Sequence, residues 1–450
     1  MTIRTRRILF FTSFLIFLIT SPAIIMYSLG YKLNIENFKI QKTGGIFVNI
    51  KYDDYRISVN ERIKKDVTKK IFLQKGVLIP NLLTKNYKVS VEKDGYLEWS
   101  KTLKVESGII TEVRNIFLMP KELVFEDIEN NTLDFIISVS GEKIAYLKQN
   151  SVTLYDIKNE KKSIIEGIEK KMMKLVGFTS DENDIFLEND STIYKTSYSG
   201  NNILEIQKSK KELYLNAIPS IEDRNIIYVL SDKNTLYEIN FLDRSNKNII
   251  SEIVNFYLTD KDIFYLTKEP KNFYKKDISS EKTTQLTFHP LNDMDIHSKI
   301  IKKFNDPIAI IDTNKNLFLF NYKSETFNKL SSDVIDAELS TDLSKILYLK
   351  DREVYVYYLE DSYPSKKSGE IDLIGRFGQQ IKDASWFSYN NHHIFLNMEN
   401  NIQIIELDGR DKRNSYEIIK NVDKFRYNNT DQSIYFIKDG NLKKAILLEE

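Results

Sequence analysis

The chain has 450 residues, with 65 Lys and Arg against 64 Asp and Glu, no Cys, 26 Tyr, 26 Phe and 8 Pro. The balanced charge provides no basic field for nucleic acid, and the absence of Cys excludes disulfides, a thiolate nucleophile and Cys-ligated zinc. Many aromatic residues with few prolines favour an all-β fold of short strands, and the length allows two or three domains.

The uncharged, apolar residues 8–28 are predicted to form a transmembrane helix. As a helix this run spans about 30 Å, the thickness of the hydrocarbon core of a bilayer. Arg4, Arg6 and Arg7 precede it, which is typical of a start that stays in the cytoplasm while the downstream chain is exported. Three lysines soon after the run weaken this charge bias. We therefore predict a single-pass anchor in a cell membrane, within a segment 1–30, with residues 29–450 extracytoplasmic.

Two other interpretations of this run remain open. The small residues Ser21, Pro22 and Ala23 follow an apolar core, as at the cleavage site of a signal peptide. The apolar run continues through residues 24–26, however, and is longer than the roughly 7 to 15 residues usual for a signal peptide. The third interpretation is a helix buried in a protein core. Length and flanking arginines favour the uncleaved anchor.

Residues 31–120 are predicted to form a small β-sandwich. Asp94 and Gly95 are a strong hairpin signal, because glycine adopts a positive φ without strain. Short runs with period-two alternation, separated by turn-forming residues, occur at 46–50, 56–59, 87–91, 103–105 and 113–118.

Within this region, residues 45–120 resemble a PEGA domain, a small β-rich module often found on bacterial surface proteins. The resemblance rests on Ile-Pro-Asn-Leu-Leu at 79–83, Tyr-Lys-Val-Ser-Val at 87–91, and Lys-Asp-Gly-Tyr at 93–96 followed by Trp99. The tetrapeptide that names the family is absent, because its expected place at 52–55 reads Tyr-Asp-Asp-Tyr. Properties tied to that turn are therefore not expected here, while the resemblance implies a place in the bacterial cell envelope.

Tyr96 and Trp99 follow the predicted hairpin and are candidate binding residues. If both lie on an exposed face of the sheet, they form a platform on which a sugar can stack. If they pack in the core or across strands, they have no such role. Core packing is favoured, because buried aromatic residues are commoner than binding platforms.

Residues 121–450 contain a repeat with a period near 40 residues, about four short strands per unit and no helical pattern, which predicts a β-propeller. Eight blades are expected, or seven if the units around Ile263 and Ile308 share one sheet. Residues 123–128 form an unassigned strand that we expect to pair with the last repeat and close the ring. One isoleucine opens the second strand of each unit: Ile144, Ile185, Ile226, Ile263, Ile308, Ile346, Ile394 and Ile434.

A polar turn precedes most of these isoleucines, as at residues 140–143, 181–184 and 340–345. These turns resemble a degenerate form of the Ser-Pro-Asp-Gly turn of TolB-like and WD40-like propellers. The resemblance implies a structural turn in which an acidic residue such as Asp342 caps the backbone. A calcium loop is the alternative, but no repeat has the dense oxygen-ligand spacing that calcium requires.

The sequence offers no catalytic constellation. It has 4 His, and we expect the adjacent His392 and His393 to face solvent in a turn, while His289 and His297 stand apart. It shows neither a nucleophile elbow nor a phosphate-binding glycine loop. We therefore predict no catalytic residue, metal or cofactor. Tyr363 and Phe377, in an insertion at 361–380, are the remaining candidate contact residues. A disordered linker explains that insertion equally well.

These observations favour a membrane-anchored, extracytoplasmic binding or scaffold protein over an enzyme. Its expected ligand is a protein, a peptide or a cell-wall glycan, and nucleic acid is not expected. The alternative is a glycan hydrolase or lyase that acts at the central funnel of the propeller.

Overall fold

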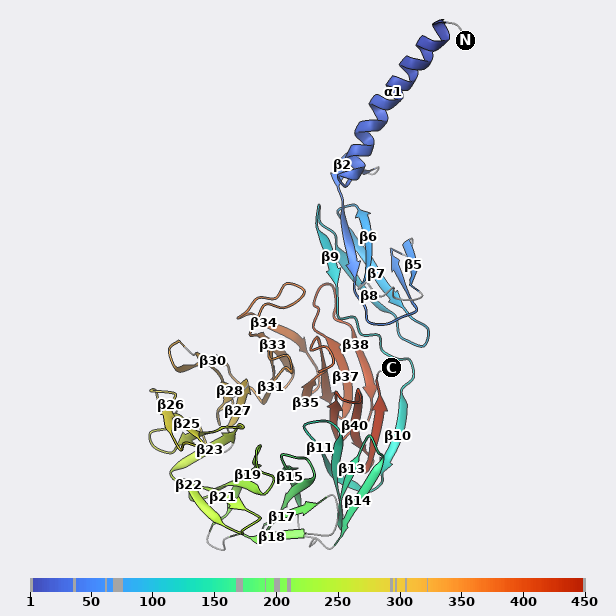
Figure 1. Ribbon diagram of the computed structural model, residues 1–450. Helices are drawn as coiled ribbons and strands as arrows, with labels where there is room; N and C mark the ends of the chain where they lie inside the picture. Colours follow the sequence, from blue (N-terminus) through green and yellow to red (C-terminus); the bar gives the residue numbers. More distant parts are fainter. Residues whose placement is uncertain are drawn as a thin grey trace. The chain divides into compact units, whose positions relative to one another are not determined.

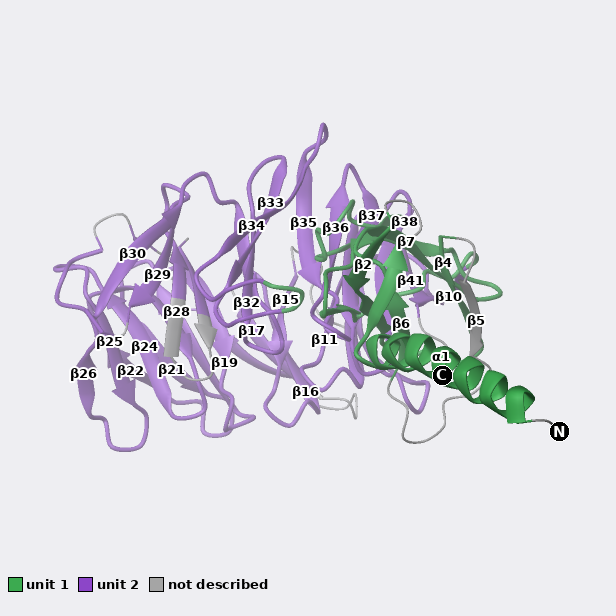
Figure 2. Ribbon diagram, turned by 90° about the horizontal axis from the view of Figure 1, so that it is seen from above, with its two compact units in different colours: residues 1–122, 363–365, 405–416 green, residues 123–362, 366–404, 417–450 purple. Residues whose placement is uncertain are grey.

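The computed structural model describes residues 3–34, 38–60, 63–67, 76–166, 173–190, 192–197, 203–208, 212–291, 294–295, 298–303, 306–321 and 323–447. The chain divides into two compact units (Figure 2). Unit 1 comprises residues 1–122, 363–365 and 405–416, and unit 2 comprises residues 123–362, 366–404 and 417–450. The predicted domain boundaries at residues 30 and 120 stay predictions, and His297 lies outside the described residues.

Helix α1 spans Ile3–Ser28 and contains the predicted run 8–28. None of its residues is buried, and large apolar side chains such as Phe10, Ile16 and Ile19 are exposed along it. The helix is long and apolar enough to cross a membrane, a property that a signal sequence near an N-terminus shares. The structure therefore confirms the apolar helix.

The β-structure of unit 1 is a sandwich of two sheets that follow a two-stranded hairpin. Side chains of both sheets meet in one core that includes Ile46, Ile57, Val89 and Trp99. The predicted strand at 113–118 is wrong in its bounds, because the strand here ends at Val113. The hairpin pairs β1 (Tyr31–Asn34) with β2 (Lys39–Lys42). The first sheet has the strand order β6 (Val77–Leu82), β3 (Gly44–Val48), β9 (Ile110–Val113). The second sheet has the order β5 (Ile63–Val67), β4 (Tyr55–Val59), β7 (Asn86–Glu92), β8 (Trp99–Lys104).

The described residues of unit 2 form eight four-stranded antiparallel sheets, each built from consecutive strands except the one that closes the ring. The first four sheets are β11–β14 (Thr132–Ile137, Lys143–Lys148, Ser151–Asp156, Lys161–Glu166), β15–β18 (Lys174–Phe178, Asp184–Glu188, Thr192–Ser197, Ile203–Gln207), β19–β22 (Tyr214–Pro219, Ile226–Ser231, Leu236–Asn240, Asn246–Ile250) and β23–β26 (Ile253–Leu258, Asp262–Thr267, Phe273–Asp277, Thr283–Gln285). The others are β27–β30 (Lys299–Lys303, Asp306–Ile311, Leu317–Asn321, Thr326–Ser331), β31–β34 (Asp336–Leu339, Lys345–Leu349, Glu353–Tyr358, Ile371–Arg376), β35–β38 (Ile381–Trp386, His393–Met398, Asn401–Glu406, Ser415–Ile419) and β39–β41 (Lys424–Asn428, Ser433–Lys438, Asn441–Ile446) with β10 (Val124–Glu129).

These sheets follow one another around a common axis, which is the arrangement of a β-propeller (Figure 1). The first strand of each sheet lies innermost: β11 contacts β15, β27 contacts β31, and β39 contacts β11 across the junction of the ends. Strand β10 pairs with β41, from Val124 opposite Ile446 to Glu129 opposite Leu442. The predicted closing strand is thereby confirmed, and β10 joins the start of the propeller to its end as an outer strand of the last sheet.

All eight repeat isoleucines lie on the second strand of a sheet. Ile263 lies in β24 and Ile308 in β28, so the two irregular units belong to different sheets. The seven-blade alternative required these units to share one sheet. The number of blades itself stays a prediction.

The turn before β32 has the predicted structural role. Asp342 Oδ1 accepts hydrogen bonds from Ser340 Oγ (2.5 Å) and from the Ser344 amide (3.2 Å), while Oδ2 pairs with Lys345 Nζ at 3.0 Å. Burial acts to raise the pKa of Asp342, but these hydrogen bonds and the Lys345 charge outweigh it and lower the pKa to about 2. Leu343 takes a φ of 60°, the left-handed conformation that Gly141 adopts in the first turn.

Two expectations for the later repeats are wrong. His393 is buried instead of facing solvent, because β36 already begins there and its ring packs edge-on against Phe387. The insertion at 361–380 is not a linker throughout, because residues 371–376 are β34, the fourth strand of their sheet.

Candidate functional site

Trp99 is a core residue and not part of an exposed platform. It lies at the start of β8 with 2% of its surface exposed, and it packs in the hydrophobic core of unit 1. Its indole Nε1–H donates to Glu406 Oε2 at 3.1 Å. The sugar-stacking interpretation is therefore wrong for Trp99, because alternation along β8 turns this side chain inward.

Tyr96 lies at the edge of an open groove in unit 1. The ring is half-buried, meets Tyr52 edge-on at 5.6 Å between centroids, and carries the Lys93 ammonium 5.6 Å from its centre. The groove has a volume of about 600 Å³, and charged side chains of both signs line it beside Tyr96 and Leu97. The charged residues include Asp54, Arg56, Glu92, Lys93 and Lys121. This surface offers hydrogen-bond donors and acceptors together with the aromatic residues Tyr55 and Tyr96.

Tyr363 is held by polar contacts within unit 1. Its hydroxyl donates to the Glu112 carbonyl at 2.9 Å, accepts from the Arg114 amide at 3.1 Å, and also contacts the Arg410 guanidinium. Arg410 stacks over the ring at 5.1 Å and donates to the Asp408 carboxylate. Burial raises the pKa of Tyr363 to about 12. Tyr363 therefore binds other parts of the chain.

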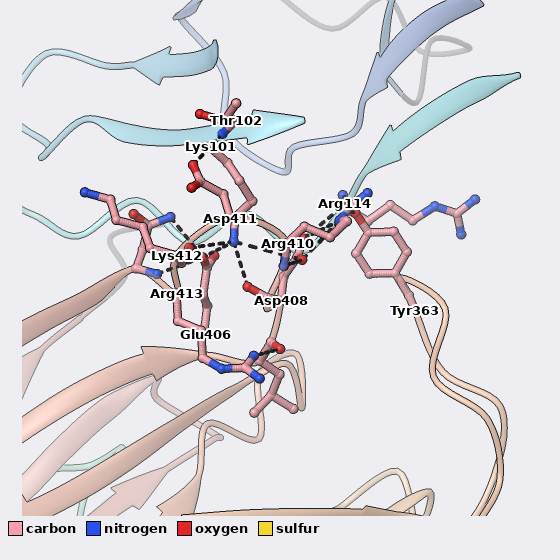
Figure 3. A network of polar contacts seen from close by, with 12 residues as sticks. Lys101, Thr102, Arg114, Tyr363, Glu406, Asp408, Arg410, Asp411, Lys412 and Arg413 are labelled. Carbon is pink, nitrogen blue, oxygen red and sulfur yellow. Dashed lines mark hydrogen bonds and ion pairs between the residues drawn. The ribbon is translucent and has the colours of Figure 1, made fainter. Parts of the chain in front are cut away.

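The centre of this network is the ammonium of Lys101, whose side chain is fully buried (Figure 3). Nζ contacts Glu406 Oε1 at 2.5 Å, the Asp408 carbonyl at 2.7 Å and the Lys412 carbonyl at 3.1 Å, so all three of its protons have acceptors. Asn414 donates to the same Glu406 oxygen from its backbone at 2.8 Å. A buried charge is tolerated only when it is paired and hydrogen-bonded in this way.

We call Lys101, Glu406, Asp408 and Arg410 the buried charge cluster. Burial acts to raise the pKa of Asp408, but hydrogen bonds from Arg410 and the charge of Lys101 outweigh it and lower that pKa. The cluster holds residues 405–416 as part of unit 1. A sequence signal was present: Lys101 stands between Trp99 and Leu103 at the alternating inward positions of a strand, where an apolar residue is expected.

Phe377 follows β34 in unit 2 and is half-buried. Its ring lies over Gly375, where an added Cβ would come within 2.6 Å of it. Its backbone amide donates to the Arg352 carbonyl at 2.9 Å. Phe377 belongs to unit 2, whereas Tyr96, Trp99 and Tyr363 belong to unit 1.

The innermost strands of unit 2 carry a second set of charges. Ion pairs link neighbouring inner strands: Lys299 on β27 with Asp336 on β31, Asp383 on β35 with Arg426 on β39 at 3.0 Å, and Lys424 on β39 with Asp134 on β11. We call these six residues and Glu338 the inner-strand charges. The side chains of the pairs are 29% to 50% exposed, unlike Lys101, so water screens them.

Glu338, on β31, has a raised pKa. Although Glu338 is exposed to solvent, the protein atoms around it desolvate the carboxylate and raise its pKa to about 7. The Asp383 charge acts in the same direction, and the Lys299 and Arg426 charges oppose it. Its backbone carbonyl accepts a hydrogen bond from Trp386 Nε1 at 3.2 Å. A carboxyl with this pKa is partly protonated at neutral pH and can both donate and accept a hydrogen bond.

Among the described residues, no group of three or more His, Asp or Glu side chains is placed to hold a metal ion. His393 Nδ1 contacts the Asn390 side chain at 3.1 Å.

Comparison with known proteins gives likeness of fold only. No family model and no curated protein sequence matches the chain. Among solved structures, it is similar to the computationally designed protein Ika8 (9% identity, TM-score 0.50, covering 72% of this chain and 98% of that one). It is also similar to the dihydro-heme d1 dehydrogenase NirN in complex with DHE (11%, 0.48, covering 64% and 66%) and to the β-propeller domain of Cps50 (Swd1) from Myceliophteria thermophila (9%, 0.42, covering 73% and 99%).

Proposed function

We propose that this chain is a membrane-anchored binding or scaffold protein of a bacterial cell envelope. The observation that carries the proposal is the exposure of α1, in which none of 26 mostly apolar residues is buried by protein. Such a helix is stable in a bilayer, where its apolar surface needs no protein cover. Arg4, Arg6 and Arg7 at its start favour an orientation with residues 29–450 extracytoplasmic.

The PEGA-like character of residues 45–120 supports a role at the cell surface. Asp54 stands at the third position of the tetrapeptide that names the family, where that name has glycine. Asp54 adopts a φ of 53°, in the left-handed region that glycine favours. The backbone at this position thus has the conformation that glycine favours, which supports the resemblance.

The groove beside Tyr96 is the proposed binding surface for a protein, peptide or cell-wall glycan. It combines an aromatic edge with basic and acidic groups, a mixture that suits hydrogen-bonding, largely uncharged or zwitterionic ligands. Phe377 remains a proposed contact residue of unit 2. Trp99 and Tyr363 are occupied by contacts within the chain and are not proposed as ligand contacts.

Two experiments test this function. External protease, added to intact cells with a permeable outer barrier, is expected to degrade the chain after Lys32; full protection would contradict export. For binding, the full chain in detergent is tested on glycan arrays and in envelope pull-downs. Changing Lys93 and Lys121 together to alanine is expected to weaken capture about tenfold. Lys88→Ala, an exposed lysine of β7 outside the groove, is the matched control. If the double variant and Lys88→Ala capture the ligand equally well, the groove is not the binding surface.

Glu338 supports the second candidate function, a glycan hydrolase or lyase that acts at the inner strands of the propeller. Its pKa of about 7 suits a general acid, and the Asp383 charge contributes to that shift. Release of sugar fragments from wall polysaccharide, abolished by Glu338→Gln, would establish this activity. If the unmodified chain releases no sugar fragments, the hydrolase or lyase function is ruled out.

A further inference from the structure

The hairpin formed by β1 and β2 has one apolar face that the described protein does not cover. In its register, Tyr31 lies opposite Lys42 and Leu33 opposite Ile40. Since successive side chains of a strand alternate between faces, Tyr31, Leu33, Ile40 and Lys42 share one face. The other face carries the polar residues Lys32, Asn34, Lys39 and Gln41.

The apolar face is exposed. Leu33 is 51% exposed, Ile40 54% and Tyr31 36%, and Phe38, just before β2, is 79% exposed. A two-stranded hairpin is at best marginally stable in water unless a hydrophobic face packs against something. This hairpin therefore has an amphipathic pattern whose apolar side has no cover within the described residues.

Continuity with α1 indicates what covers this face. The helix ends at Ser28, Gly30 turns the chain with a φ of 82°, and β1 begins at Tyr31 and contacts α1. The hydroxyl and amide of Thr43, directly after β2, both donate to the Gly30 carbonyl at 2.7 Å, so both ends of the hairpin are fixed at the end of the helix. Figure 1 labels β2 beside this end of α1. If α1 crosses a bilayer, the hairpin starts at the membrane surface.

The chemistry of the hairpin fits the interface of a bilayer. Aromatic side chains such as Tyr27 and Tyr31 favour the headgroup level, where an apolar ring and a polar hydroxyl are both accommodated. Residues 29–43 contain three lysines and one glutamate, which gives a net charge of 3 − 1 = +2. Lysine side chains at this depth extend toward lipid phosphates.

We propose that the β1–β2 hairpin lies on the bilayer, with Leu33, Ile40 and Phe38 immersed in the interface and its lysines at the phosphates of anionic phospholipids. The hairpin is thus a second membrane contact beside the anchor, and this inference rests on the proposed anchoring by α1.

The absence of native Cys permits a direct test with single-Cys variants of the full chain. Ile40→Cys and Gln41→Cys, which lie on opposite faces of the hairpin, are labelled with the fluorophore NBD and reconstituted into vesicles of phosphatidylcholine and phosphatidylglycerol. Lipids with a nitroxide near the headgroup quench a label at their depth. Quenching at position 40 is expected to be severalfold stronger than at position 41. Ile16→Cys, in the middle of α1, reports insertion of the helix.

The outcomes are distinct. Quenching of the Ile16→Cys label by deep nitroxides, with stronger quenching at 40 than at 41, supports the inference. Quenching at 16 with equal values at 40 and 41 overturns the hairpin contact and leaves the anchor intact. No quenching at 16 overturns both. Self-quenching of the label at 40 without nitroxide, absent at 41, would assign the face to a second copy of the chain and overturn the lipid proposal.

Discussion

Two sets of charged side chains, one in each unit, lie in opposite surroundings. In unit 1 the ammonium of Lys101 is fully buried and has an acceptor for each proton, the closest being Glu406 at 2.5 Å. In unit 2 the inner-strand pairs, such as Asp383 with Arg426 at 3.0 Å, keep a third to a half of their side chains exposed. The atoms in contact are alike, and the access of water differs.

This difference separates charges that stabilise the fold from charges that can contact a ligand. Breaking a buried pair leaves one charge without solvent or partner, so the buried charge cluster fixes the position of residues 405–416. An exposed pair adds little stability, because water and salt replace the lost partner. The six paired inner-strand charges can therefore exchange their partners for a ligand at small cost, whereas the buried charge cluster cannot.

The largest expected effect is that of Lys101→Met. Removing the ammonium leaves the Glu406 carboxylate buried with its main partner lost, which should reduce the free energy of unfolding of unit 1 by about 3 kcal/mol. Urea denaturation of the full chain in detergent measures this. Lys104→Met, with a 69% exposed side chain on the same strand, should change stability by no more than about 0.5 kcal/mol. The double variant Lys101→Met with Glu406→Gln should recover much of the loss; no recovery would show that packing, not charge, matters here.

Glu129 occupies an intermediate environment at the end of the closing strand β10, with a 21% exposed side chain. Burial acts to raise its pKa, but hydrogen bonds from Lys148, Tyr146 and Lys162 on the first sheet outweigh it and lower the pKa to about 2. Because this pKa is below that of the unfolded chain, near 4.5, the stabilisation is present above about pH 4.5 and is lost as the pH falls toward 2.

Glu129→Gln should therefore cost about 1 to 2 kcal/mol at pH 7, after allowance for screening by solvent, and almost nothing near pH 2. Urea midpoints of both proteins across this pH range measure the difference. The exposed Glu126, 3.8 Å from Lys444, supplies the control variant Glu126→Gln, whose effect on stability at pH 7 should stay below about 1 kcal/mol. A constant difference at every pH would contradict the electrostatic role of Glu129.

Glu338→Gln should have a smaller effect with the opposite dependence on pH. The folded pKa of Glu338, about 7, lies above its unfolded value of 4.5, so folding favours the neutral carboxyl. Ionisation therefore destabilises the fold as the pH rises from about 4.5 through 7. Glutamine cannot ionise, and the variant should tolerate more urea than the unmodified chain at pH 8 and an equal amount at pH 4. A variant that is less stable at pH 8 would refute the raised pKa.

The smallest expected effect is that of Arg426→Gln. Its partner Asp383 is a third exposed and remains hydrated when the guanidinium is removed, so the loss should stay below about 1 kcal/mol. Added salt should make the variant and the unmodified chain converge further. A loss as large as that of Lys101→Met would abolish the distinction between the two sets of charges.

Sequence reasoning succeeded where the determining pattern is local or repeated. The apolar run of α1, the isoleucine on each second strand and the closing strand β10 follow from length, period and an unpaired strand at each end. The buried charge cluster could not be predicted in full, because Trp99 and Glu406 meet across 307 positions of the chain. The sequence predicts that Tyr363 is an exposed contact residue, because it lies in an insertion. Its hydroxyl instead contacts Arg410, which lies in a loop whose position only the fold determines.

The two Trp residues of the chain are divided between the units, with Trp99 in unit 1 and Trp386 in unit 2. Both indoles are buried, and each N–H donates to one acceptor: a carboxylate oxygen of Glu406 for Trp99, and the backbone carbonyl of Glu338 for Trp386. The chain thus carries a native spectroscopic probe in each unit. Replacing one indole by phenylalanine leaves an emission signal that follows the melting of the other unit alone.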